Sequence, residues 1–128
     1  PQIKLIAIDE QPFTVGDIRF IPIRAMHKEL PVLGFRVDDV VYITDANYIA
    51  PAELDKCRGA EVLVLNALRR EPHYSHFNLN QALEIIENLR PKQAYLTHIS
   101  HHMGVYESVQ HELPAGVSLA YDGLVVCV

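Results

Sequence analysis

The sequence predicts an α/β (α+β) fold in which one mixed sheet carries its helices on one face. Two features of the 128-residue chain indicate this fold. In the first third, short apolar runs rich in β-branched residues alternate with polar links, which is typical of strands and hairpins. From residue 61 onward, a strand, a helix and a second strand follow one another, which is typical of a sheet covered by helices. The length fits a single domain.

Apolar runs and turn residues place the elements of the first half. The predicted elements are strands at 3–8 and 18–23, a polar loop at 24–31, a hairpin of 33–37 and 40–44, and a helix from 51 to 59. The hairpin is predicted because Asp38-Asp39 separates two apolar runs. The helix is predicted because Pro51 suits a first helical turn and Gly59 suits a helix end.

The second half alternates strands with one long helix. The predicted elements are a strand at 61–65, a polar loop at 66–76, a helix from 78 to 90, a strand at 93–96 and a closing hairpin of 117–121 and 124–128. The helix follows from apolar residues at helical spacing, and Pro91 stops it. The closing hairpin follows from the turn dipeptide Asp122-Gly123.

The composition disfavours several classes of protein. Hydrophobic residues make up 49% and charged residues 21% of the chain, as in ordinary globular proteins. The apolar runs are far shorter than the roughly 20 residues that a membrane helix needs. Cys57 and Cys127 lie in no pairing motif, so we expect reduced thiols and a cytoplasmic protein.

The formal charge of −5 bears on the partner. It argues against a broad basic surface for nucleic acid and leaves only a local patch of Arg69, Arg70 and Lys92. Nucleic acid is therefore a disfavoured partner, and a small anionic substrate fits better.

Polar side chains follow strand ends or precede a helix at four places. These are His27, Asp45, the pair His73 and His76, and His98. Side chains at such positions can converge on one rim of a sheet. Imidazole is the commonest ligand for zinc-like metals, and a carboxylate can bridge two cations. Each residue also has an ordinary structural alternative, as a loop histidine, a turn former, a helix cap or part of a solvated histidine-rich loop.

Taken in chain order, several segments resemble the latter half of metallo-β-lactamase-fold phosphodiesterases. The segments are Gly34-Phe35-Arg36 after His27, Tyr42-Ile43-Thr44-Asp45, Asn66-Ala67-Leu68, Leu96-Thr97-His98-Ile99-Ser100-His101 and Ala120-Tyr121-Asp122-Gly123. The nearest likeness is to phosphoribosyl cyclic phosphate phosphodiesterases, with tRNA 3′-end endonucleases as more distant relatives. The resemblance implies the C-terminal half of a four-layer αββα sandwich, so that residues 1–128 would be one partial domain.

The resemblance also implies roles for individual residues. His27 would bind one metal ion, Asp45 would bridge two, and His98 would bind the second. His76 would lie beside the substrate phosphate as a proton donor or charge stabiliser, which makes Asp45 and His76 the expected catalytic pair. His73 and His101 have no clear counterpart and are expected to support the ligands or the substrate.

The family's His-x-His-x-Asp-His motif is absent from these residues. We therefore expect two divalent ions only in a longer parent protein, with zinc or manganese favoured and iron left open, and weak metal binding and no activity in this portion alone. The start at Pro1 favours a truncated or cleaved fragment or a separate domain over a natural half-protein. An uncovered apolar sheet face would favour self-association or pairing with the missing N-terminal half.

Three functions stay open at this point. The leading one is metal-dependent hydrolysis of a small phosphodiester-type substrate. The alternatives are a thioester or lactone hydrolase of the same fold, and a non-catalytic interaction module with structural histidines. His76 separates the first two, because a phosphodiesterase needs an acid on the phosphate side and a thioesterase does not.

Overall fold

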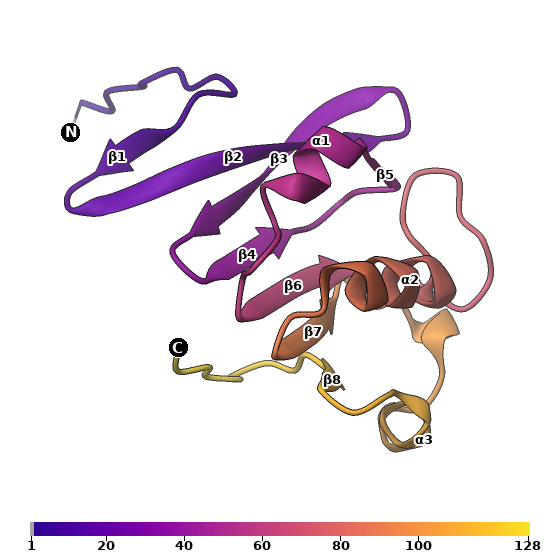
Figure 1. Ribbon diagram of the computed structural model, residues 1–128. Coiled ribbons are helices and arrows are strands. Elements are labelled where there is room, and N and C mark those ends of the chain that lie inside the picture. Colours follow the sequence, from indigo (N-terminus) through magenta and orange to yellow (C-terminus); the bar gives the residue numbers. More distant parts are fainter. Residues whose placement is uncertain (1) are drawn as a thin grey trace.

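The computed structural model describes residues 2–128, and one mixed sheet dominates it (Figure 1). The strands are β1 (Phe13–Val15), β2 (Ile18–His27), β3 (Leu30–Val37), β4 (Val40–Ile43), β5 (Tyr48–Ile49), β6 (Val62–Asn66), β7 (Gln93–Thr97) and β8 (Val117–Leu119). The helices are α1 (Pro51–Asp55), α2 (Leu79–Leu89), α3 (Tyr106–Glu112) and the 3₁₀ turn η1 (His101–Met103). The strand order in the sheet is β1-β2-β3-β4-β6-β7-β8, and β5 pairs with β2.

The sheet has an antiparallel part and a parallel part. Strands β1 to β4 pair antiparallel with their neighbours, whereas β4, β6, β7 and β8 are all parallel. Because β2 and β4 are both antiparallel to β3, the carboxyl ends of β2, β4, β6 and β7 lie at the same edge of the sheet.

The helices cover one face of this sheet. Ile43, Leu65, Leu96 and Leu119 are aligned across the four parallel strands, and each is almost fully buried. The same core cluster includes Ala82 and Ile86 of α2 and Val109 of α3, and the partly buried Leu54 of α1 packs against it. The predicted mixed sheet with helices on one face is therefore confirmed.

The opposite face carries a row of partly accessible residues. Phe35, Tyr42, Val64 and Tyr95 are aligned on it, and Tyr42 is 48% exposed. At its far end the Phe20 ring stacks on Phe13, with centroids 5.2 Å apart. This face is the apolar surface on which the prediction of self-association or pairing rests, and that prediction stays open.

Helix α2 is defined by its ends as well as by its apolar stripe. The Asn78 side chain accepts a hydrogen bond from the Gln81 backbone N–H, and the Gln81 side chain accepts one from the Asn78 N–H. This reciprocal pair satisfies two backbone donors that the first turn leaves open. At the other end, Arg90 adopts a left-handed backbone (φ 52°) before Pro91. The helix predicted from 78 to 90 is therefore confirmed.

Two predictions in the first half were wrong. Residues 3–8 form no strand, and Ile3 and Leu5 are 87% and 90% exposed, because no strand in the described chain pairs with them. The predicted loop at 24–31 is instead the end of β2, a turn at Lys28-Glu29 and the start of β3. Exposed Arg24 alternates with buried Ala25 there, so its polarity reflects an outward face and not a loop.

The C-terminal prediction was also partly wrong. Strand β8 pairs parallel with β7, and residues 124–128 form no strand, so the closing hairpin does not exist. Helix α3 was not predicted, because Val109 is the single buried residue among its seven. The helix beginning at Pro51 ends at Asp55, and Gly59 lies in the turn that follows, with φ 76°.

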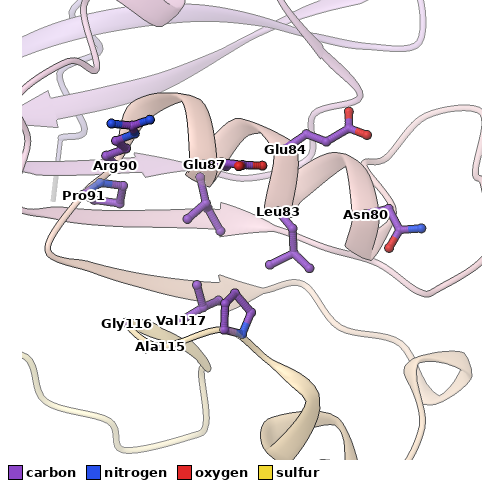
Figure 2. A pocket seen from close by; sticks show the side chains of 11 residues that line it. Asn80, Leu83, Glu84, Glu87, Arg90, Pro91, Ala115, Gly116 and Val117 are labelled. Atoms are coloured by element: carbon purple, nitrogen blue, oxygen red, sulfur yellow. The ribbon is translucent and has the colours of Figure 1, made fainter.

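A hollow lies on the helical side, away from the strand ends. It has a volume of about 630 Å³ and lies between α2 and the segment before β8, with Leu83, Glu87, Arg90 and Val117 among its lining residues (Figure 2). Within residues 2–128, no helix is long and apolar enough to cross a membrane.

Candidate metal centre

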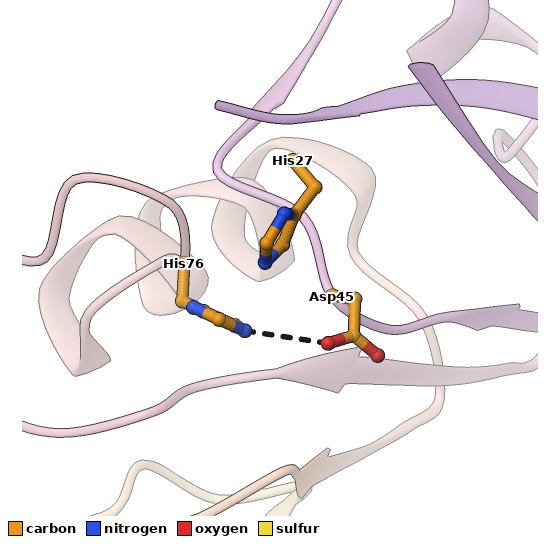
Figure 3. A group of neighbouring side chains, drawn as sticks. All are labelled: His27, Asp45 and His76. Carbon is orange, nitrogen blue, oxygen red and sulfur yellow. Dashed lines mark hydrogen bonds and ion pairs between the residues drawn. The ribbon is translucent and has the colours of Figure 1, made fainter. Parts of the chain in front are cut away.

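Four of the predicted site residues converge at the edge where the parallel strands end. His27 is the last residue of β2, Asp45 follows β4 by two positions, and His98 directly follows β7. His76 comes from the loop before α2. Figure 3 shows the imidazoles of His27 and His76 directed toward the Asp45 carboxylate. The topology thus brings together residues that are up to 71 positions apart, His27 and His98.

Asp45 is at the centre of this cluster. Its Oδ1 lies 3.3 Å from His76 Nε2 and 3.5 Å from His98 Nε2. The rings of His76 and His98 are stacked, and His27 meets His76 edge-on, both with centroids 4.8 Å apart. Ligand atoms of His27, Asp45 and His76 all lie within 4.8 Å of one another, which makes them the metal-binding candidate group found in the described chain.

The backbone at Asp45 is held by a buried side chain that the sequence analysis did not assign. Asp45 has φ 55°, a left-handed conformation that is unusual for a residue other than glycine. The fully buried Asn66 donates to the Ala46 carbonyl (2.9 Å) and accepts from the Ala46 N–H (3.0 Å). Asn66 therefore fixes the peptide that follows Asp45. The one available signal was a polar residue ending an otherwise apolar strand.

A second unassigned residue, Ser75, connects His73 to the cluster. Its hydroxyl lies 2.9 Å from His76 Nδ1 and 3.2 Å from His73 Nδ1, and Ser75 is only 2% exposed. His73 Nδ1 also lies 3.3 Å from His76 Nδ1, so His73 contacts His76 directly as well as through this hydroxyl. His73 does not belong to the group of His27, Asp45 and His76. The sequence offered no signal beyond a small polar residue between two histidines.

The surroundings of His76 favour its neutral form. Burial lowers the pKa of His76, the hydrogen bond that His76 donates to Asp45 opposes this, and the neighbouring imidazoles of His98, His27 and His73 lower it further. The net result is a pKa below the usual range for histidine. A neutral imidazole offers a lone pair to a metal ion or a hydrogen-bond donor.

Residues 1–99 match the β-lactamase superfamily domain. The chain belongs to this family. It is 36% identical to a new diphosphatase from the PhnP family, with a TM-score of 0.93 over 96% of this chain and 48% of that one. It is similar to human tRNase Z, short form, in fold alone, with 20% identity and a TM-score of 0.69 over 92% of this chain and 47% of that one.

A curated relative has a different activity in its name. The chain is 33% identical over 126 residues to an octanoyltransferase of Porphyromonas gingivalis, covering 97% of this chain and 26% of that protein. The chain thus spans about a quarter of this relative and about half of the diphosphatase. The expected membership of the metallo-β-lactamase superfamily, with only part of its relatives' length present, is confirmed.

The donor set of this superfamily domain fits a divalent metal. In a tetrahedral site with ligands at about 2.1 Å, neighbouring donor atoms lie about 3.4 Å apart. The Asp45–His98 separation of 3.5 Å is close to that value. The imidazoles of His27 and His98 and the carboxylate of Asp45 are donors that suit a divalent metal ion.

His101 and the basic patch lie outside this cluster. His101 is an exposed residue of η1, and its ring packs against His102 with centroids 3.9 Å apart. Arg69 donates to the carbonyls of Glu71 and Pro72. Arg70 pairs with Glu112 and Lys92 with Glu61. All three cations thus have partners within the described residues.

Proposed function

We propose that the complete protein hydrolyses a small phosphodiester-type substrate at a two-metal centre, of which residues 1–128 supply about half. The observation that carries this proposal is the position of Asp45, whose Oδ1 lies between two imidazole nitrogens at 3.3 and 3.5 Å. A carboxylate in that position suits the bridge between two cations. The 36% identity to a diphosphatase over nearly the whole chain supports the choice of a phosphate-containing substrate.

The position of each residue in the cluster gives it a separate role in the proposed centre. His27 and His98 would each hold one ion, and Asp45 would hold both. Bound ions would polarise the phosphoryl group and lower the pKa of water at the site. His76 would direct Nε2 at the substrate, because its Nδ1 is occupied by Ser75. A negatively charged substrate beside His76 favours the protonated ring, which can then donate to the leaving oxygen.

The rest of the centre would come from outside these residues, as the absent His-x-His-x-Asp-His motif implies. Residues 1–128 alone are therefore expected to bind metal weakly and to be inactive. Pairing of the open sheet face with the missing half, or with a second copy, belongs to the same proposal, as does a cytoplasmic location.

The test uses the full-length parent protein. We expect two zinc or manganese ions per chain by elemental analysis, and hydrolysis of bis(p-nitrophenyl) phosphate. Asp45→Ala should lower both metal content and activity, the latter by about a hundredfold or more. Asp17→Ala, in the exposed turn between β1 and β2, is the matched control and should change neither. A parent protein with neither metal nor activity would leave the histidines a structural or binding role.

Thioester or lactone hydrolysis is the second candidate, and the similarity to an octanoyltransferase favours it. Such an enzyme handles an acyl group, so an octanoyl thioester is the substrate to compare with the phosphodiester. His76→Gln separates the two candidates. It should abolish phosphodiester hydrolysis, which needs an acid for the leaving oxygen, and should spare thioester hydrolysis. Equal loss of both activities would count against the role given to His76.

A further inference from the structure

Ser75 is a buried serine whose hydroxyl has two imidazole partners. It lies in the loop before α2 and is 2% exposed, so its hydroxyl contacts protein groups and not bulk solvent. Oγ is 2.9 Å from His76 Nδ1 and 3.2 Å from His73 Nδ1, and the Ser75 backbone N–H donates to His73 Nδ1 at 3.4 Å. The loop thus ties both imidazoles to one residue.

The partners of His76 define which nitrogen carries the proton. A carboxylate oxygen accepts hydrogen bonds, so in the contact of 3.3 Å with Asp45 Oδ1 the donor is His76 Nε2–H. In the neutral ring Nδ1 is then a bare acceptor, and the Ser75 hydroxyl is the donor that reaches it at 2.9 Å. Asp45 therefore accepts from one ring nitrogen and Ser75 donates to the other, and both hydrogen bonds require the same neutral tautomer of His76.

The neighbouring rings do not supply the proton at this position. His73 Nδ1 also lies 3.3 Å from His76 Nδ1, but it accepts the Ser75 backbone N–H and so carries no proton of its own. His98 stacks on His76 with an interplanar angle of 15°, and His27 meets it at 87°. These contacts restrict the plane of the imidazole, but they do not distinguish its two flipped orientations. A directional hydrogen bond at Nδ1 does distinguish them.

We propose that Ser75, backed by His73, is a positioning residue that keeps the His76 ring oriented with Nε2–H toward Asp45 and the substrate. Its catalytic consequence rests on the proposed function, whereas its effect on the ring does not. Without the hydroxyl, the ring samples both orientations and both neutral tautomers, and Nε2 is correctly placed in only part of the population.

The experiment compares Ser75→Ala with Ser75→Thr in the zinc-loaded full-length parent. The alanine variant removes the hydroxyl, the threonine variant keeps it, and Ser108→Ala is a control at an exposed serine of α3. We expect Ser75→Ala to lower kcat on bis(p-nitrophenyl) phosphate by about tenfold to a hundredfold, with KM and zinc content changed less than about twofold. Ser75→Thr should retain most of the rate, and Ser108→Ala all of it.

A direct readout of the ring accompanies the kinetics. The ¹⁵N shifts of the His76 ring nitrogens distinguish a protonated from a bare nitrogen. We expect Nε2–H in the parent and a mixture in Ser75→Ala. An unchanged tautomer together with an unchanged kcat would overturn the proposal. If Ser75→Ala does not fold, Ser75→Cys replaces it, since a thiol of similar size is a poor donor and should give the same mixture.

The two proposals can fail separately. A parent protein that does not hydrolyse the phosphodiester would refute the proposed function, and the ¹⁵N shifts would still decide the role of Ser75. An active parent whose Ser75→Ala variant keeps the rate and the tautomer would refute only the role of Ser75.

Discussion

Asp45 Oδ1 lies 3.5 Å from His98 Nε2, although the two residues follow different strands that β6 separates in the sheet. Both have a left-handed backbone, with φ 55° and 57°. Both residues therefore leave the strand before them with the same backbone conformation, and their side chains come into contact although β6 lies between β4 and β7. Such backbone costs of order 1–3 kcal/mol at a residue other than glycine, and it persists where the surroundings enforce it.

Position 45 should therefore depend on backbone preference as well as on charge. Asparagine tolerates the left-handed conformation and valine does not. We expect Asp45→Val to destabilise the full-length parent by about 1–2 kcal/mol more than Asp45→Asn, measured by urea unfolding with metal removed. Both variants should lose metal, since neither offers a carboxylate. Equal stability of the two variants would show that the strain at Asp45 is negligible.

Asn66 should contribute to stability through its two hydrogen bonds to Ala46. Asn66→Ala leaves the buried Ala46 N–H without a partner, at a cost of about 1–3 kcal/mol. It also removes one of the two donors to the Ala46 carbonyl, which still accepts from the Phe77 N–H. We expect a loss of about 2–4 kcal/mol in urea unfolding, together with weaker metal binding, because the peptide after Asp45 is released. Asn80→Ala, at an exposed position of α2, should change stability by less than about 0.5 kcal/mol. A small effect of Asn66→Ala would mean that the turn at Asp45 and Ala46 is stable without the Asn66 side chain.

The fold was predictable where local signals are strong. Helix α2 combines an apolar stripe, the Asn78 cap and Pro91, so its limits follow from the sequence. The β2–β3 hairpin was missed because Arg24 and His27 are polar on an outward face and at a strand end. Residues 3–8 have the composition of a strand but find no partner, and pairing is not a local property.

Part of the site was also predictable, because the strand ends that carry it have clear local signals. The convergence of His27, Asp45 and His98 follows from strand ends that meet at one edge. The contributions of Ser75 and Asn66 were not predictable, because they depend on burial and on contacts made across the chain. A serine or asparagine in a sequence is usually a surface residue, and the local sign of burial was limited to the position of Asn66 at the end of an apolar strand.

Glu53 should make a pH-dependent contribution to stability. Its Oε2 accepts from the Arg24 N–H and from Lys56 Nζ, both at 2.7 Å, and so ties α1 to β2. Burial alone raises the pKa of Glu53, but the hydrogen bonds from Lys56 and Arg24 and their positive charges outweigh it, and the pKa is below its usual value. A lowered folded-state pKa means that this stabilisation is present above the unfolded pKa and is lost as the pH falls through the folded one.

The corresponding variant is Glu53→Gln. We expect it to cost about 1–2 kcal/mol in urea unfolding at pH 7, and the difference from the parent to shrink toward zero at about pH 3. Glu87→Gln, at an exposed position of α2, should be neutral at both pH values. A difference that stays constant between pH 7 and 3 would show that the charge of Glu53 is irrelevant to its role.

The two cysteines should differ sharply in reactivity. Both are free, but Cys57 is buried beside the Glu53 carbonyl and Cys127 is exposed. Burial raises the pKa of the Cys57 thiol to about 11. At pH 8 only about one molecule in a thousand then carries the reactive thiolate, and the alkylating reagent cannot reach it in the folded chain. We expect iodoacetamide to modify Cys127 in the native protein and Cys57 only after unfolding, as followed by mass spectrometry. A Cys127→Ser variant should therefore stay unmodified until denaturant is added, and rapid native labelling of that variant would place Cys57 in a region that opens readily.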